Sequence, residues 1–138
     1  MSDGAVRGRT VLVVDSDNGT RFYLRQGLSA EGYVVNELSS PEIVPYLAAH
    51  KKTGIVLLGT EMGLQTRWDL VRSIRKISSA TLIVLSAHND EKSLIDAIKN
   101  GADDYVCKPF YLGEMLARIK TSLRRTKSQR GRKSALGR

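Results

Sequence analysis

Short runs of consecutive apolar residues alternate along the chain with segments of helical periodicity. The runs at 10–15, 54–59 and 81–86 are typical of strands that are covered on both faces, and shorter runs at 33–36 and 104–107 predict two more strands. Helical segments of about a dozen residues separate the strands, which favours right-handed crossovers and a parallel sheet. The pattern predicts a doubly wound α/β sandwich of five strand–helix units.

Capping residues and apolar stripes indicate where the five helices lie. Asp17 or Asn18 can cap the first helix, a serine followed by Pro41 can begin the second, and Asp90 can cap the fourth. Gly101 suits the left-handed end of the fourth helix. The third and fifth helices are expected at 68–76 and 112–125. The residues expected to face the core are Phe22, Leu24, Leu28, Leu70, Val71, Ile74, Ile77, Met115, Leu116, Ile119 and Leu123.

The net charge of +8 is concentrated at one end of the chain. The first 123 residues hold 15 Lys and Arg and all 14 Asp and Glu, whereas residues 124–138 hold the other seven basic residues and no acid. We expect a disordered N-terminus at 1–8, one domain at 9–125 and a basic linker or tail at 126–138. Nonspecific nucleic-acid contact is the alternative interpretation of the tail.

Composition argues against a membrane-spanning protein, a structural zinc site and a fold held by disulfides. No apolar run approaches the roughly 20 residues of a membrane span, and no secretory stretch follows Met1, so we expect a cytoplasmic protein without membrane contact. Cys107 is the single cysteine, and together with His50 and His88 it cannot build an ordinary structural zinc site. We expect Cys107 to be a small buried apolar residue.

Polar residues follow the strands at the edge of the sheet where ligands bind in open α/β folds. An acid, a hydroxyl and a lysine meet there, which suits binding of a small anion together with a cation. The residues at these strand ends are Asp15, Ser16, Asp17, Gly59, Thr60, Glu61, Ser86, Ala87, Cys107, Lys108 and Pro109.

Several motifs resemble the receiver domain of two-component response regulators. They are VLVVD at 11–15, LSA at 85–87, GADDY at 101–105 and KPF at 108–110, while EMLARI at 114–119 and LRR at 123–125 look like the OmpR/PhoB branch. The resemblance covers about residues 9–125. It implies a flavodoxin-like (CheY-like) fold with strand order 2-1-3-4-5 and five helices. In ordinary members an aspartate at the end of the third strand accepts a phosphoryl group from a histidine kinase, with magnesium.

The chain departs from this family at the phosphoacceptor. Gly59 stands where the aspartate belongs, and the acidic pair after the first strand is reduced to Asp15 with Ser16, although Asp17 follows. One aspartate, a carbonyl and water make a poor octahedral site, so we expect weak or absent magnesium binding and no other metal. The degenerate phosphorylation pocket would comprise Asp15, Ser16, Asp17, Gly59, Ser86 and Lys108, without a catalytic residue.

The resemblance also implies roles for Lys108, Ser86 and Tyr105. Lys108 contacts the phosphoryl group in the family, and here we expect it to pair with Asp15 and to precede a cis proline. Ser86 and Tyr105 occupy the positions of the switch hydroxyl and the switch aromatic. Without a phosphoryl group the pair is either locked in one state or responsive to another ligand, and the alternative is that Tyr105 is an ordinary half-buried strand aromatic.

By the same resemblance, the fourth helix, fifth strand and fifth helix form a dimer face. Leu94 and Lys99 depart from the branch at this face, which weakens the expected homodimer without excluding it. An amphipathic helix with a solvated charged face remains the alternative. The residues expected there are Ile95, Ile98, Asp103, Asp104, Glu114, Leu116, Arg118 and Lys120.

These expectations favour a regulatory module, not an enzyme. The favoured function is an atypical receiver of a transcriptional regulator that acts without phosphorylation, and it implies DNA contact through an output domain absent from this chain. One alternative is a phosphoacceptor that uses Asp17 or Thr60, and another is a sensor of a small ligand in the vacated pocket. Flavin is disfavoured because no Ser/Thr-rich phosphate loop follows the first strand.

Overall fold

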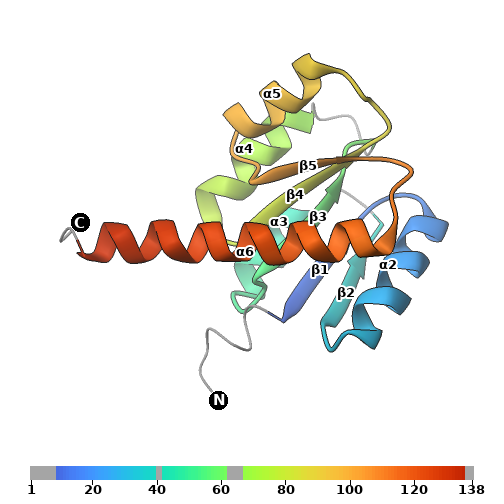
Figure 1. The fold of residues 1–138 in the computed structure, drawn as a ribbon, viewed down its shortest axis with the longest axis horizontal. Coiled ribbons are helices and arrows are strands. Elements are labelled where there is room, and N and C mark those ends of the chain that lie inside the picture. The colour runs from blue at the N-terminus through green and yellow to red at the C-terminus, as the bar shows by residue number, and fades with distance from the viewer. Residues whose placement is uncertain (1–8, 40–41, 62–66, 136–138) are drawn as a thin grey trace.

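The computed structural model describes residues 9–39, 42–61 and 67–135, and in this part of the chain five parallel strands form one sheet (Figure 1). Their order is β2-β1-β3-β4-β5, as the family resemblance predicts. The pairing is parallel throughout. The strands are β1 (Thr10–Val14), β2 (Val34–Leu38), β3 (Ile55–Gly59), β4 (Thr81–Ser86) and β5 (Asp104–Cys107).

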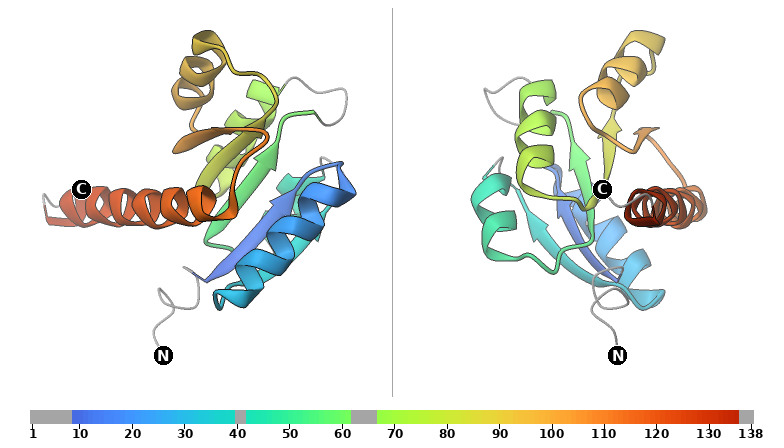
Figure 2. Two further views of the ribbon diagram at one scale, coloured as in Figure 1. Left: turned by 45° about the vertical axis from the view of Figure 1, so that its right-hand side comes forward. Right: turned by 90° about the vertical axis from the view of Figure 1, so that its left-hand side faces the viewer.

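Helices cover both faces of the sheet (Figure 2). Two core clusters show the layers: α3, α4 and α5 pack on one face, and α2 and α6 pack on the other. The helices in the described residues are α2 (Asn18–Ala30), α3 (Ile43–Ala49), α4 (Arg67–Ile77), α5 (Glu91–Lys99) and α6 (Leu112–Ala135). None of the described helices is both long and apolar enough to cross a membrane.

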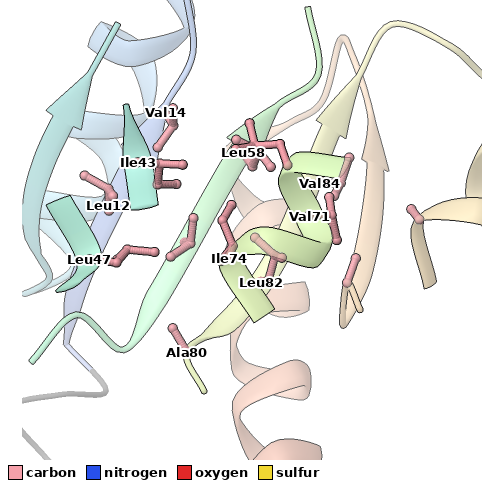
Figure 3. Close-up of a cluster of buried hydrophobic side chains, with 14 of the residues drawn as sticks. Leu12, Val14, Ile43, Leu47, Leu58, Val71, Ile74, Ala80, Leu82 and Val84 are labelled. Atoms are coloured by element: carbon pink, nitrogen blue, oxygen red, sulfur yellow. The ribbon is translucent and has the colours of Figure 1, made fainter. Parts of the chain in front are cut away.

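The apolar runs form the centre of the sheet because successive side chains of a strand point to opposite faces. In β1, Val11 and Val13 belong to the cluster under α2 and α6, whereas Leu12 and Val14 belong to the cluster under α3 and α4 (Figure 3). These four side chains are 0% exposed. Burial on both faces therefore fixes the register that brings the carboxyl ends of β1, β3 and β4 together.

The predicted caps are largely confirmed. The side chain of Asp17 accepts a hydrogen bond from Thr20 N at the start of α2, and that of Asp90 accepts one from Ser93 N at the start of α5. Gly101 has φ of +124°, in the region that glycine adopts without strain. The second helix starts later than expected, at Ile43. Pro45 therefore lies in the first turn, where backbone N–H groups have no partner within the helix and the missing N–H of proline breaks no hydrogen bond. Residues 40 and 41, expected at its start, lie outside the described residues.

Three expectations about the helices are wrong. Phe22 is 56% exposed because Leu24 and Leu28 define the buried face of α2, and Phe22 lies on the other side. Ile77 is 46% exposed because it is the last residue of α4, beyond the turn that packs on the sheet. The last helix passes its expected end at Arg125 and continues to Ala135, beyond the sheet (Figures 1 and 2). The expected disordered segment at 1–8 lies outside the described residues.

Candidate functional site

The strand ends bring an acid, a glycine, a hydroxyl and a lysine together at the carboxyl end of the sheet. We call this group of residues and its immediate surroundings the mouth of the sheet. Asp15 follows β1, Gly59 ends β3, Ser86 ends β4 and Lys108 follows β5. Backbone hydrogen bonds extend the sheet past the strands: Lys108 N donates to Ser86 O at 2.8 Å, and Thr60 N donates to Leu85 O at 3.0 Å. The mouth is therefore built on the rigid part of the fold.

Asp15 and Lys108 form the shielded ion pair that the sequence predicts. Lys108 Nζ lies 2.7 Å from Asp15 Oδ2, and the two side chains are 21% and 3% exposed. The other carboxylate oxygen of Asp15 accepts the backbone N–H of Asp17 at 2.9 Å. Both oxygens of this buried carboxylate are thus engaged within the chain. The bond from Lys108 to Pro109 is cis, as expected.

The carboxyl group of Asp15 lies over Gly59. A β-carbon built on Gly59 would lie 2.7 Å from Asp15 Cγ and still closer to Oδ2. Neighbouring non-bonded carbon atoms pack at about 3.5–4.0 Å, so a side chain at Gly59 and the present position of Asp15 exclude each other. The Asp15 carboxylate fills the space that a side chain at the end of β3 would enter.

Glu61 adds a second carboxylate at the mouth, where it was not expected to be a member of the degenerate phosphorylation pocket. Its Oε1 accepts the backbone N–H of Ala87 at 3.0 Å, and its Oε2 lies 3.7 Å from Lys108 Nζ. Burial opposes ionisation of Glu61, but the Ala87 N–H and the Lys108 charge outweigh it, so its pKa lies below the ordinary value. An acid two residues after the third strand is the only signal in the sequence, and it does not reveal the contact with the turn after β4.

Asp17, the third acid near the mouth, caps α2. Its carboxylate accepts the hydroxyl of Thr20 at 2.7 Å and the backbone N–H of Thr20 at 2.8 Å. The side-chain hydrogen bond from Thr20 is the main reason that the pKa of Asp17 lies below its ordinary value. Ser16, also expected in the pocket, donates its hydroxyl to the backbone oxygen of Glu61 at 3.3 Å.

The carboxylates at the mouth do not fit a magnesium ion. Magnesium needs near-octahedral oxygen donors, usually including one or two carboxylates. Here Asp15 uses both oxygens within the chain, Asp17 caps α2 through Oδ2, and Glu61 accepts the Ala87 N–H. No group of three or more His, Cys, Asp or Glu residues that could hold a metal occurs in the described part of the chain.

Ser86 and Tyr105, the two expected switch residues, contact the same turn. Ser86 is 0% exposed, and its hydroxyl accepts the backbone N–H of His88 at 3.1 Å. Tyr105 is 6% exposed, and its hydroxyl donates to the backbone oxygen of His88 at 2.6 Å. The ring therefore points inward and is bonded to the turn that joins β4 to α5. Cys107, expected to be buried, is only half-buried, because its thiol faces the turn after β4 and lies 3.6 Å from the same His88 oxygen.

A cavity of about 500 Å³ opens beside this mouth. The rings of Tyr23 and Phe110 lie on its wall with centroids 6.2 Å apart, and the Tyr23 hydroxyl accepts the backbone N–H of Leu112 at 2.8 Å. Most of the lining is apolar. The lining residues are Asp17, Gly19, Thr20, Tyr23, Ala87, Lys108, Pro109 and Phe110.

The expected dimer face divides into an exposed apolar part and an internally paired charged part. Leu94, Ile95 and Ile98 of α5 are 42%, 43% and 45% exposed. Arg118 pairs within the chain with Asp104 at 3.1 Å and with Glu114 at 3.3 Å.

Asp103 and Leu116, two further residues of the expected dimer face, make contacts within the chain. Asp103 pairs with Arg75 of α4 at 3.0 Å and accepts the backbone N–H of Leu82 at 2.8 Å. Leu116 is partly buried and packs on the core, whereas Lys120 is exposed. The ion pair between Arg75 and Asp103 could not be predicted from the sequence, because the two residues are 28 positions apart along the chain.

Comparisons with known sequences identify the family. The model of the response regulator receiver domain matches residues 11–120. The KDP operon transcriptional regulatory protein KdpE of Escherichia coli is 35% identical over 115 residues, which cover 83% of this chain and 51% of KdpE. The uncharacterized transcriptional regulatory protein YvcP of Bacillus subtilis is 36% identical over 116 residues, which cover 84% of this chain and 49% of YvcP. The chain thus spans about half the length of the curated relatives it matches.

Solved structures agree with the fold. A two-component response regulator from Clostridium difficile has a TM-score of 0.78 and 24% identity, covering 84% of this chain and 96% of that one. A response regulator receiver domain protein from Clostridium thermocellum also has a TM-score of 0.78, with 25% identity, covering 87% of this chain and 98% of that one. By the sequence match over most of its length and by its strand order, this chain belongs to the response regulator receiver domain family.

Proposed function

We propose that this chain is a pseudo-receiver: a regulatory domain that acts without aspartyl phosphorylation. The observation that carries the proposal is the position of the Asp15 carboxylate over Gly59, where it leaves no room for a side chain. Glycine offers no oxygen nucleophile, and Lys108, the cation of the mouth, is already paired with Asp15 at 2.7 Å. An incoming phosphoryl group would meet neither an acceptor nor a free countercharge at this position.

Neither substitute acceptor is well placed. The hydroxyl and the backbone N–H of Thr20 both donate to Asp17 Oδ2, which holds this carboxylate at the start of α2 as the helix cap. The Thr60 hydroxyl oxygen is buried, and a hydroxyl is a much poorer acceptor than a carboxylate. These placements support the unphosphorylated mode over the alternative in which another residue takes the phosphoryl group.

We expect the intact mass of the chain to stay unchanged after incubation with acetyl phosphate or with a phosphorylated histidine kinase. The physical reason is the absence of an accessible carboxylate at the end of β3. The response regulator from Burkholderia pseudomallei whose structure contains a phosphorylated aspartic acid, treated in parallel, controls for the activity of the donor. A stable adduct with the mass of one phosphoryl group on the wild-type chain would contradict the proposal.

The proposed output is contact between proteins through the face made of α5, β5 and α6. Leu94, Ile95 and Ile98 form an exposed apolar patch on α5 that suits a homodimer contact. The relatives, of which the match covers about half, are named transcriptional regulators, which supports a role in cytoplasmic transcription control through a DNA-binding segment outside this chain.

The Ile95→Asp variant tests this face. A charge at the centre of a dimer patch should raise the dissociation constant of the dimer by about tenfold or more, because an apolar contact is replaced by a desolvated carboxylate. Sedimentation velocity across a concentration series measures the change. Phe22→Asp is the matched control, because Phe22 is an exposed apolar residue of α2, 56% exposed, outside the face. Equal masses for wild type and Ile95→Asp at every concentration would reject the dimer face.

A further inference from the structure

Two groups at the mouth are suited to hold the oxygens of an anion. They are the ammonium of Lys108 and the backbone N–H of Ala87, and donors of this kind form strong hydrogen bonds with charged oxygens. The carboxylate of Glu61 contacts both: Oε1 accepts the Ala87 N–H at 3.0 Å, and Oε2 lies 3.7 Å from Lys108 Nζ. Glu61 thus accepts one of the donors that an external oxyanion would need and lies within ion-pair distance of the other, which also donates to Asp15.

We propose that Glu61 is a built-in anion that replaces an external phosphoryl group and holds the turn after β4 in one conformation. This inference rests on the proposed function, since it assumes that no phosphoryl group enters the mouth. It assigns the two carboxylates different roles: Asp15 fills the space over Gly59, and Glu61 accepts the Ala87 N–H beside the Lys108 ammonium.

The turn after β4 is held from several sides. Glu61 accepts the N–H of Ala87, the Ser86 hydroxyl accepts the N–H of His88, and the Tyr105 hydroxyl donates to the oxygen of His88. Asp90, two residues further on, caps α5 through the N–H of Ser93 at 2.9 Å. The conformation of the turn therefore sets where α5 begins, and α5 carries the exposed apolar patch of Leu94, Ile95 and Ile98.

Exposure separates the roles of the two acids further. The Asp15 side chain is 3% exposed and the Glu61 side chain 42% exposed. Exposed ion pairs contribute little to stability, so removing Glu61 should leave the domain folded. Replacing Glu61 should change only the hydrogen bonding of the Ala87 amide and the access of anions to Lys108. A local effect of this kind indicates a positioning role, whereas a loss of overall stability would indicate a merely structural role.

The experiment compares wild type with Glu61→Ala and Glu61→Gln by nuclear magnetic resonance on the full chain. In Glu61→Ala we expect hydrogen exchange of the Ala87 amide to speed up by about tenfold, because its acceptor is lost. Titration with inorganic phosphate should shift the Ala87 amide saturably in Glu61→Ala, with a dissociation constant at least about tenfold lower than that of wild type. Glu61→Gln, which keeps the shape and loses the charge, should fall between them.

Glu31→Gln is the matched control, because it removes one exposed glutamate at the C-cap of α2, away from the mouth. Unchanged Ala87 exchange in Glu61→Ala would overturn the inference. Faster exchange without a gain in phosphate binding would also overturn it, since Glu61 would then merely brace the turn. A phosphoryl adduct on the wild-type chain contradicts the proposed function by a separate measurement, so the two failures are distinguishable.

Discussion

Replacing Lys108 by methionine is expected to lower the free energy of unfolding by about 3–5 kcal/mol, because the Asp15 carboxylate then stays buried without its cation. The side chain of Asp15 is 3% exposed, and its Oδ2 has Lys108 Nζ at 2.7 Å. Methionine keeps most of the aliphatic length of lysine, so the loss reports mainly on charge. Urea unfolding, followed by circular dichroism, measures the difference.

A double-mutant cycle separates the interaction energy between Asp15 and Lys108 from the cost of replacing either residue alone. Asp15→Asn keeps a side-chain oxygen for the N–H of Asp17 and removes the charge, so the double variant with Lys108→Met should cost much less than the two single losses combined. We expect a coupling energy of about 2 kcal/mol or more, within the range for contacting residues. Coupling below about 0.5 kcal/mol would show that the pair does not hold the mouth together.

The pair of Lys92 and Asp96 serves as the control for this cycle. It has the same 2.7 Å separation, but the Lys92 side chain is 84% exposed on α5. An exposed helical pair of this spacing contributes about 0.3–0.5 kcal/mol, so Lys92→Met should have little effect. Similar losses for Lys92→Met and Lys108→Met would mean that burial does not set the cost.

The strands and the members of the mouth could be predicted because both depend on short-range pattern. Continuous apolar runs identify β1, β3 and β4, whose side chains are buried on both faces. Residues directly after parallel strands meet at one end of the sheet, which places Asp15 and Lys108 at the same end. The family resemblance then pairs them, although they are 93 residues apart.

Contacts that depend on loop conformation or on helix packing could not be predicted. Glu61 reaches Ala87 only because the chain after β3 turns toward the end of β4, and no local pattern encodes that direction. Asp103 was expected to be available to a second copy, but it is bonded to Arg75, whose guanidinium also donates to Gly101 O at 2.7 Å. The exposure of Phe22 follows in the same way from which face of α2 meets α6.

These contacts give the mouth of the sheet an arrangement without an external anion. The Lys108 charge faces two carboxylates, Asp15 at 2.7 Å and Glu61 at 3.7 Å, and the inward ring of Tyr105 is bonded to the turn that Glu61 contacts. One cation and two anions leave this group of side chains with a net negative charge, which disfavours the approach of a further anion. The pairing also makes the residue at position 59 decisive, since any side chain there displaces Asp15 from its cation.

Gly59→Ala should therefore lower the free energy of unfolding by about 1–3 kcal/mol, the usual cost of forcing extra atoms into a packed interior. The sign is informative because glycine in a strand interior is ordinarily the less stable choice, by about 0.5–1 kcal/mol relative to alanine. The added methyl group would meet Asp15 Cγ at 2.7 Å and push the carboxylate off Lys108. Urea unfolding of the variant and of wild type measures the effect.

Gly113→Ala is the control for this prediction, because a β-carbon at Gly113 in α6 has nothing within 4 Å. Alanine there should raise stability by about 0.4–1 kcal/mol through the lower entropy of the unfolded chain. Opposite signs for the two glycines would show that the contact with Asp15, not glycine replacement as such, sets the cost at Gly59. If Gly59→Ala is as stable as wild type, Asp15 can leave its place at no cost, and the mouth could admit an acceptor side chain after all.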